Sequence, residues 1–363
     1  KIRMVNRNTV EIDCTDVRYT DAPYDLMRRI RASYYLIGAM LGRFGAAKTT
    51  MPGGCNFGVR PIDQHIKGMT ALGADVEVTG GFVYAKALDG KLHGTRIYLD
   101  KVSVGATMNI ILAASMARGR TVIENAAKEP HIVDLANFLN SMGCRVKGAG
   151  TDVIRIRGVQ RLQSRRPYAV IPDQIETGTL MIAAAATGGD VVISGAIPTH
   201  MEALSAKLLE MGVSVTSADD WIRVRSNGTF RSVNVKTQGY PGFPTDLQQP
   251  LSALLTVSKG TSLVTETIFE ARFRFLDELR KMGADVRVIE STAIITGVEK
   301  LVGARVNATD LRAGAAMVIA ALMAEGTTEI TGVGYILRGY ERFDEKLRQL
   351  GAQVERIACP DDD

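Results

Sequence analysis

The sequence has few cysteines, few aromatic residues and no long apolar run, and each shortage argues against a class of protein. The 363 residues include four cysteines that lie far apart and form no Cys-x-x-Cys pair. This disfavours a disulfide framework and a zinc site and favours a reducing cytoplasm. No apolar run is long enough to span a membrane, and the N-terminus has no signal-peptide pattern. The four histidines show no metal-ligand spacing, so we expect no metal site.

The charge pattern narrows the range of partners. The 44 basic residues are interleaved with 39 acidic ones, and aromatic residues make up only 6% of the chain, which disfavours a nucleic-acid surface. The net charge of +5 is compatible with small anionic substrates. With 46% apolar residues, the chain has the composition of a soluble globular protein of two or three domains.

An internal repeat organises the chain. Five glycines, each preceded by Leu or Met and followed three residues later by Val, recur at intervals of 68 to 71 residues: Gly73, Gly143, Gly212, Gly283 and Gly351. A period this regular indicates a duplicated structural unit. The apolar spacing before each glycine predicts an amphipathic helix that ends there in a left-handed cap. We expect a strand directly after the glycine and a second, more apolar helix in mid-repeat, at residues 106–116, 179–186 and 313–323.

The register of the repeat predicts the domain organisation. Ile2 stands where the other repeats have the valine, 74 residues before Val76, so we expect a sixth repeat that lacks its front segment. Three repeats in each half predict two similar α/β domains, at residues 1–171 and 172–363. Cys144 falls in a position that alanine or valine occupies in the other repeats, which indicates core packing for this thiol.

Cys55 has no counterpart in the other repeats and lies on a glycine-rich loop, Pro52-Gly53-Gly54-Cys55, with Arg60 five residues further on. The glycines let backbone N–H groups approach an anion, and a thiol beside a cation can be reactive. The loop therefore suits chemistry on a phosphorylated substrate. The alternative is a small apolar core residue, which is the commoner role of a lone cysteine.

Residues 100–107 open a buried helix with the sequence Asp-Lys-Val-Ser-Val-Gly-Ala-Thr. Helix N-termini leave backbone N–H groups without partners, so this one, with Lys101, Ser103 and Gly105, predicts a phosphate or diphosphate site. A plain N-cap is the competing interpretation.

Charged side chains stand near helix starts in the second half. Asp246 follows Pro244-Thr245 and is either a helix cap or a general base. Arg312, two residues after Asp310, and Arg338 suit a bidentate grip on carboxylate or phosphate. Taken singly, each arginine could equally be a solvated surface residue.

Together these stretches resemble the UDP-N-acetylglucosamine enolpyruvyl transferases, the 1-carboxyvinyltransferases of peptidoglycan synthesis, over essentially the whole chain. The matching stretches are residues 22–26, 31–33, 52–55, 60–63, 101–107, 124–127, 172–173, 243–246, 308–312 and 338–342. The resemblance implies an inside-out α/β barrel of two similar domains, each made of three βαβ-type repeats, that close over the substrate.

The resemblance also implies a reaction and its residues. The enolpyruvyl group passes from phosphoenolpyruvate to the 3-hydroxyl of UDP-N-acetylglucosamine, phosphate is released, and no cofactor takes part. In the family roles, Cys55 protonates or covalently captures phosphoenolpyruvate and is the target of the inhibitor fosfomycin, and Asp246 takes the hydroxyl proton. Arg60 and Arg338 hold phosphoenolpyruvate, with Arg312 assisting. The family roles also assign contacts to the nucleotide sugar. The diphosphate is contacted by Arg31, Lys101, Ser103, Val104 and Gly105, the uridine by Pro61, Asp63 and Gln64, and the sugar by Ile268.

One departure keeps alternatives open. The family's N-terminal Lys-Asn pair has no counterpart in this chain, which indicates an N-terminally truncated sequence or an impaired polypeptide. A catalytically silent paralogue or fragment that binds UDP-sugar is therefore an alternative. The sister enzyme of the shikimate pathway shares the fold, but it lacks the cysteine loop and uses no nucleotide sugar, so Cys55 and Lys101–Gly105 argue against it.

Overall fold

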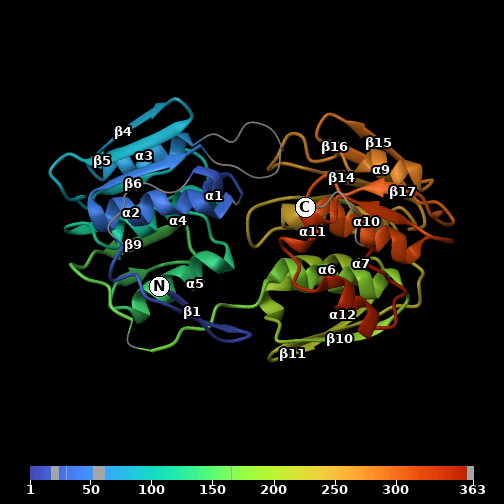
Figure 1. Ribbon diagram of the computed structural model, residues 1–363. Helices are drawn as coiled ribbons and strands as arrows, with labels where there is room; N and C mark the ends of the chain where they lie inside the picture. Colours follow the sequence, from blue (N-terminus) through green and yellow to red (C-terminus); the bar gives the residue numbers. More distant parts are fainter. Residues whose placement is uncertain (18–23, 30, 52–61, 165, 358–363) are drawn as a thin grey trace. The chain divides into compact units, whose positions relative to one another are not determined.

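The computed structural model describes residues 1–17, 24–29, 31–51, 62–164 and 166–357 (Figure 1). Contacts between Cα atoms divide the chain into two compact units. Unit 1 lies within residues 1–168, and unit 2 comprises the chain from residue 169 onward together with residues 128–131. A division into two folding domains at residue 171 remains our proposal.

Unit 1 combines short strands with five helices and one 3₁₀ turn among its described residues. Its strands are β1 Ile2–Asn6, β2 Thr9–Ile12, β3 Ala46–Thr50, β4 Ala74–Thr79, β5 Phe82–Ala87, β6 Arg96–Tyr98, β7 Arg120–Glu124, β8 Arg145–Lys147 and β9 Val153–Arg157. Its helical elements are α1 Tyr24–Arg29, the 3₁₀ turn η1 Arg31–Tyr35, α2 Leu36–Phe44, α3 Asp63–Ala71, α4 Val104–Ala114 and α5 Pro130–Ser141, the last of which begins in the segment assigned to unit 2.

Unit 2 repeats the same kinds of element. Its strands are β10 Asp190–Ser194, β11 Ser214–Ala218, β12 Trp221–Arg225, β13 Val235–Lys236, β14 Thr261–Thr265, β15 Asp285–Ile289, β16 Thr292–Thr296, β17 Arg305–Asn307 and β18 Glu329–Thr331. Its helical elements are α6 Gln174–Ala186, the 3₁₀ turn η2 Pro198–Met201, α7 Glu202–Glu210, α8 Thr245–Leu255, α9 Leu276–Lys281, α10 Leu311–Met323, α11 Gly334–Leu337 and α12 Phe343–Gln349.

The glycine repeat has the predicted structure at its helix ends. Helices α3, α5, α7, α9 and α12 each end just before one of the five glycines. The φ values of these glycines lie between 90° and 99°, a backbone region that glycine enters without steric penalty. The mid-repeat helices α4, α6 and α10 begin two to five residues before their predicted starts, because Ser103, Asp173 and Asp310 cap them there.

The strand expected after each glycine is present four times. Strands β4, β8, β11 and β15 begin within two residues of their glycines. After Gly351 the prediction is wrong, since residues 352–357 form no strand. The sheet formed in this last repeat holds only β17 and β18, and a chain segment becomes a strand only where it pairs with a neighbour.

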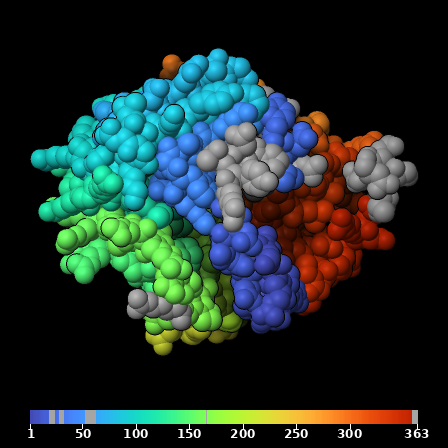
Figure 2. Space-filling model, turned by 60° about the vertical axis from the view of Figure 1, so that its left-hand side comes forward, coloured from blue at the N-terminus to red at the C-terminus, as the bar shows by residue number. Residues whose placement is uncertain are grey.

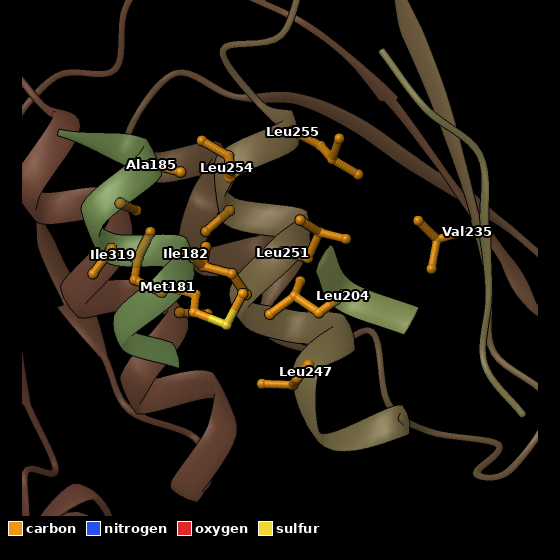
Figure 3. Packing of buried hydrophobic residues seen from close by; sticks show 14 of the residues in the cluster. Met181, Ile182, Ala185, Leu204, Val235, Leu247, Leu251, Leu254, Leu255 and Ile319 are labelled. Atoms are coloured by element: carbon orange, nitrogen blue, oxygen red, sulfur yellow. The ribbon is translucent and has the colours of Figure 1, made fainter. Parts of the chain in front are cut away.

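Each unit has helices at its centre and sheets around them, which confirms the inside-out α/β architecture. In unit 2 the helices α6, α8 and α10 pack on one another. Figure 3 shows Met181 of α6, Leu251 of α8 and Ile319 of α10 among the apolar side chains that meet there. The side chains of α8 from Leu247 to Leu255 are all buried, as expected of a helix enclosed on every side.

The surrounding sheets are small. They are β3-β5-β4, β6-β7-β9-β8 and β1-β2 in unit 1, and β10-β12-β11, β13-β14-β16-β15 and β17-β18 in unit 2. The pairs β6-β7, β13-β14 and β17-β18 are parallel and the others antiparallel. Along β9 and β12, buried and exposed side chains alternate, so the sheets that contain these strands turn an apolar face inward and a polar face to solvent.

Two further segments complete the description of unit 1. The β1-β2 hairpin is exposed along both strands, and Figure 2 shows it in dark blue at the molecular surface. Cys144 is buried at 5% exposure within the core of unit 1, as the repeat register predicts. Burial raises the pKa of its thiol, which suits a packing role.

Candidate active site

In unit 1 the predicted anion-binding residues gather at the N-terminus of α4. Ser103 has extended backbone angles, and its Oγ accepts a hydrogen bond of 3.3 Å from the N–H of Ala106. Ser103 is therefore an N-cap, as the competing interpretation held. The cap uses only one of the N–H groups of the first turn, so those of Val104 and Gly105 stand at the positive end of the helix dipole.

Gly105 lies where α3 and α4 pack closely. A Cβ atom at this position would lie 3.0 Å from Nε2 of His65. The other ring nitrogen of His65, Nδ1, lies 3.0 Å from the side-chain amide of Asn109, whose oxygen accepts a hydrogen bond from the N–H of Gly38. The amide orientation of Asn109 is thereby fixed, so its NH₂ group donates to Nδ1, and the ring proton of a neutral His65 resides on Nε2, facing Gly105.

Gln64 joins the start of α3 to the segment that leads into α4. Its side chain is buried, its oxygen accepts from the N–H of Asp100 at 2.9 Å, and its NH₂ donates to Asp63 at 2.8 Å. Lys67 donates to the Asp100 carboxylate at 2.6 Å. This bond, together with one that the Gln64 NH₂ group donates to the same carboxylate at 3.3 Å, lowers the pKa of Asp100. The structure thus brings Asp63 and Gln64 beside the segment that contains Lys101.

In unit 2, Asp246 lies between two arginines. It is the second residue of α8, and its two carboxylate oxygens lie 2.7 Å from Nη2 of Arg272 and 3.1 Å from Nη2 of Arg312. The side chain of Arg272 is only 2% exposed, whereas that of Asp246 is 36% exposed. Burial acts to raise the pKa of Asp246, but the charges of Arg272 and Arg312 outweigh it and hold the pKa well below its ordinary value. Asp246 is therefore a carboxylate at neutral pH and presents one side to solvent.

Arg312 is positioned by the cap of its own helix and by the ring of Tyr340. Asp310 caps α10 by accepting from the N–H groups of Arg312 and Ala313. The guanidinium carbon lies 5.4 Å from the centre of the Tyr340 ring, within cation–π range. The Tyr340 hydroxyl in turn lies 3.0 Å from Oγ1 of Thr179 on α6. The helix cap, the aromatic ring and Asp246 together fix the direction of this guanidinium.

The remaining predicted residues are only partly described. In unit 2, the Arg338 guanidinium lies 5.8 Å from the centre of the Tyr335 ring, and Ile268 is 45% exposed on the segment after β14. Cys55, Arg60 and Pro61 lie outside the described residues, and only the backbone of Arg31, in η1, is described.

Sequence reasoning missed Arg272. It lies 26 residues after Asp246 in a run of apolar and aromatic side chains, Phe269 to Phe275, interrupted by charges. An arginine flanked by buried aromatic residues needs a carboxylate partner, and this requirement is the sequence signal that identifies Arg272. Nothing local identified Asp246 as the partner.

Two general features of the described residues bear on the chemistry. They contain no group of three or more His, Cys, Asp or Glu side chains placed to hold a metal ion. No helix among them is both long and apolar enough to cross a bilayer.

Comparisons with known proteins agree with this arrangement. The family model described as EPSP synthase (3-phosphoshikimate 1-carboxyvinyltransferase) matches residues 1–347. A UDP-N-acetylglucosamine 1-carboxyvinyltransferase of Clostridium botulinum is 58% identical over 98% of this chain and 85% of its own length. UDP-N-acetylglucosamine 1-carboxyvinyltransferase 2 of Bacillus subtilis is 55% identical over 97% of this chain and 82% of its own length.

Solved structures share the fold. The enolpyruvyl transferase NikO from Streptomyces tendae matches with a TM-score of 0.83 at 26% identity, over 95% of this chain and 82% of its own. EPSP synthase from Acinetobacter baumannii matches with a TM-score of 0.65 at 21% identity, over 88% of this chain and 76% of its own. The second likeness concerns the fold alone.

Proposed function

The chain belongs to the EPSP synthase family and, within it, to the UDP-N-acetylglucosamine 1-carboxyvinyltransferases, and from this premise we propose its reaction and the residues that carry it. It is an enolpyruvyl transferase of peptidoglycan synthesis. Its substrates are phosphoenolpyruvate and UDP-N-acetylglucosamine, and its products are the 3-enolpyruvyl nucleotide sugar and phosphate. The observation that carries this function is the 58% identity over 98% of the chain.

The α4 terminus supports binding of the nucleotide diphosphate. The N–H groups of Val104 and Gly105 and the exposed side chain of Lys101 offer donors and positive charge to a diphosphate. We propose that Ser103 serves this site by fixing the first turn. Asp63 and Gln64, at the start of α3, would contact the uridine.

Asp246 supports proton removal from the 3-hydroxyl. A carboxylate with a depressed pKa is a weak base, but the hydroxyl becomes far more acidic as its oxygen bonds to C2 of phosphoenolpyruvate. A proton added to C3 completes the tetrahedral ketal, and loss of phosphate with a proton from the new methyl group restores the double bond. Arg272 and Arg312 keep Asp246 ionised and aimed.

The remaining roles rest on the family motif. We propose that Cys55 supplies the proton to C3 or captures phosphoenolpyruvate covalently and is the residue that fosfomycin alkylates. Arg60, Arg338 and Arg312 would hold phosphoenolpyruvate, Arg31 the diphosphate, Pro61 the uridine, and Ile268 the sugar. We also propose a cytoplasmic location, no metal or other cofactor, and no nucleic-acid or membrane partner.

Phosphate release tests the proposal. Protein is incubated with phosphoenolpyruvate and either UDP-N-acetylglucosamine or 3-phosphoshikimate, and we expect release only with the nucleotide sugar. Asp246→Asn is expected to lower kcat by about 100-fold or more. Asp285→Asn, which alters an exposed aspartate on β15, should leave kcat unchanged. A silent wild-type protein would support the alternative of a paralogue that only binds UDP-sugar, and release with 3-phosphoshikimate would contradict the substrate.

Intact mass after fosfomycin treatment tests the thiol. We expect one adduct on the wild-type protein and none on Cys55→Ala. The matched control is Cys14→Ala, which changes an exposed free cysteine and should keep the adduct. Labelling that survives Cys55→Ala would contradict the assignment.

A further inference from the structure

Glu266 is a buried carboxylate outside the predicted site residues. It directly follows β14 and is only 3% exposed. One oxygen accepts from the Thr237 hydroxyl at 2.8 Å and from the N–H groups of Ile268 at 2.8 Å and Phe269 at 3.3 Å. The other accepts from the Thr245 hydroxyl at 2.8 Å. Within the described part of the chain, this carboxylate makes hydrogen bonds and no ion pair.

Three of the other repeats do without such a carboxylate. The residue directly after the corresponding strand is Asn125 after β7, Gly195 after β10 and Gly332 after β18, with φ values of 56°, 66° and 71°. These repeats turn the chain with a left-handed backbone. Glu266 is not among the residues with positive φ, and its side chain holds the following N–H groups instead. A left-handed residue therefore suffices for the turn in these three repeats, and the buried carboxyl group of Glu266 calls for another explanation.

The start of α8 also differs from the starts of three of its equivalents. The side chains of Ser103, Asp173 and Asp310 cap α4, α6 and α10. The N-cap of α8 is Pro244, which makes no side-chain cap bond. Thr245, the first residue of α8, is held by Glu266 instead. A negative charge at this end of the helix is also favourable to its dipole.

The contacts of Glu266 with Thr245 and with the turn of residues 267–269 both connect it to Asp246. Thr245 is its neighbour in the chain. On the other side, the ring of Phe269, whose N–H Glu266 accepts, lies 5.0 Å from the guanidinium carbon of Arg272. Arg272 binds Asp246 at 2.7 Å. Glu266 thus reaches the carboxylate of Asp246 through the helix start and through its arginine partner, and it also shapes the turn that carries Ile268.

We infer that Glu266 is a positioning residue for this enzyme: through Thr245 it fixes the proton-accepting Asp246, and through the turn of residues 267–269 it sets the contact of Ile268 with the acceptor sugar. The inference rests on the proposed function. Glu266 touches no reacting atom, so it adds no chemical step. It sets the geometry in which Asp246 and Ile268 meet the nucleotide sugar, where small displacements are costly in rate.

Two substitutions test the helix arm, by which we mean the link from Glu266 through Thr245 to Asp246, separately from any effect on folding. Glu266→Gln keeps an oxygen for the N–H groups of Ile268 and Phe269 but places an NH₂ group against Thr245, so the Thr245 hydroxyl has to turn and accept a weaker, neutral hydrogen bond. Thr245→Val removes the same link from the other side, and Thr245→Ser restores it. We expect Glu266→Gln and Thr245→Val each to lower kcat about tenfold with KM for UDP-N-acetylglucosamine within about twofold. The double variant should match Thr245→Val, because the two changes act on one link.

The matched control is Thr292→Val, which removes the 3.0 Å hydroxyl pair between Thr265 and Thr292 at the same strand end without touching Glu266. It should keep wild-type kcat, and Thr245→Ser should recover most of it. Wild-type kcat in Thr245→Val, or additive losses in the double variant, would overturn the helix arm.

A binding measurement tests the sugar arm, by which we mean the link from Glu266 through the turn of residues 267–269 to the contact of Ile268 with the sugar. Thr237→Val removes a hydroxyl that donates to Glu266 and accepts from the N–H of Thr267. By calorimetry we expect UDP-N-acetylglucosamine to bind it about tenfold more weakly than wild type. Unchanged affinity would overturn this arm. A wild-type protein that binds the nucleotide sugar without turnover would contradict the proposed function, but the affinity of Thr237→Val would still decide the sugar arm. A wild-type protein that neither binds nor turns over the nucleotide sugar would contradict both the proposed function and this inference.

Discussion

Arg272 donates to Asp246 across 2.7 Å while its own side chain is almost wholly buried. A buried guanidinium without a carboxylate costs several kcal/mol, so the two residues depend on each other. Because Arg312 approaches the same carboxylate at 3.1 Å, Asp246 carries negative charge in a strongly cationic setting. This relationship links the stability of unit 2 to the catalytic role that we propose for Asp246.

Breaking this pair is expected to destabilise the fold. Arg272→Met should lower the free energy of unfolding by about 3 kcal/mol, the lower end for a broken buried pair, because the Asp246 side chain is 36% exposed. Urea unfolding measures the change. The control is Arg223→Met, whose pair with Asp190 is exposed on both sides and should contribute less than about 1 kcal/mol. Equal losses in the two variants would contradict the argument.

Asp246 should also contribute to acid unfolding. Its ordinary pKa of 3.8 applies to the unfolded chain, and in the fold the two arginines outweigh burial and lower the pKa. A depressed folded pKa gives stability that is present above pH 3.8 and lost as the pH falls below it. The stability difference between wild type and Asp246→Asn should therefore shrink in acid. A difference that stays constant from neutral pH to about pH 2 would contradict the depressed pKa.

The exposed face of β8 and β9 contains a row of like charges. Arg157 lies directly opposite Arg120 on one neighbouring strand and Arg145 on the other. In the equivalent sheet of unit 2, Thr296 lies between Thr261 and Asp285. Because like charges opposite one another repel, Arg157→Thr should raise the free energy of unfolding by about 0.5 kcal/mol at low salt and by less at 1 M salt.

Thermal melting at the two salt concentrations measures this effect. Arg287→Thr is the control, since Arg287 pairs with Ile294 rather than with a charge. A stabilisation of Arg157→Thr that is independent of salt would point to a cause other than charge repulsion.

Close packing of α2 on α4 predicts a strict requirement for Gly38. A Cβ atom there would lie 2.4 Å from the backbone oxygen of Asn109, so Gly38→Ala should destabilise the protein by about 3 kcal/mol. Gly334, at the start of α11, has nothing within 4 Å of such an atom, and Gly334→Ala should be neutral or slightly stabilising. Chemical unfolding compares the two. A tolerated alanine at residue 38 would contradict the packing of these helices.

Sequence reasoning succeeded where the cause is local. The five repeat glycines could be predicted because a helix end with positive φ needs glycine whatever surrounds it. The turn at Ser103 could be predicted as a helix start because its cap bond reaches only three residues along the chain.

It failed where the cause is tertiary. Arg272 and Asp246 are 26 residues apart, and no spacing rule joins them. Glu266 was missed because its four donors come from three separate segments. The absence of a strand after Gly351 depends on which strands are available to pair there. Cys55 and Arg60, which the motif identifies, lie outside the described residues and remain predictions.

Identification of the reaction product tests the central claim most directly. Mass spectrometry of a mixture of protein, phosphoenolpyruvate and UDP-N-acetylglucosamine should reveal a nucleotide sugar heavier by one enolpyruvyl group, with one phosphate released per molecule formed. An acceptor whose 3-hydroxyl is replaced by hydrogen should give neither. Protein that binds both substrates yet forms no heavier nucleotide sugar, or that releases phosphate with the 3-deoxy acceptor, would contradict the account.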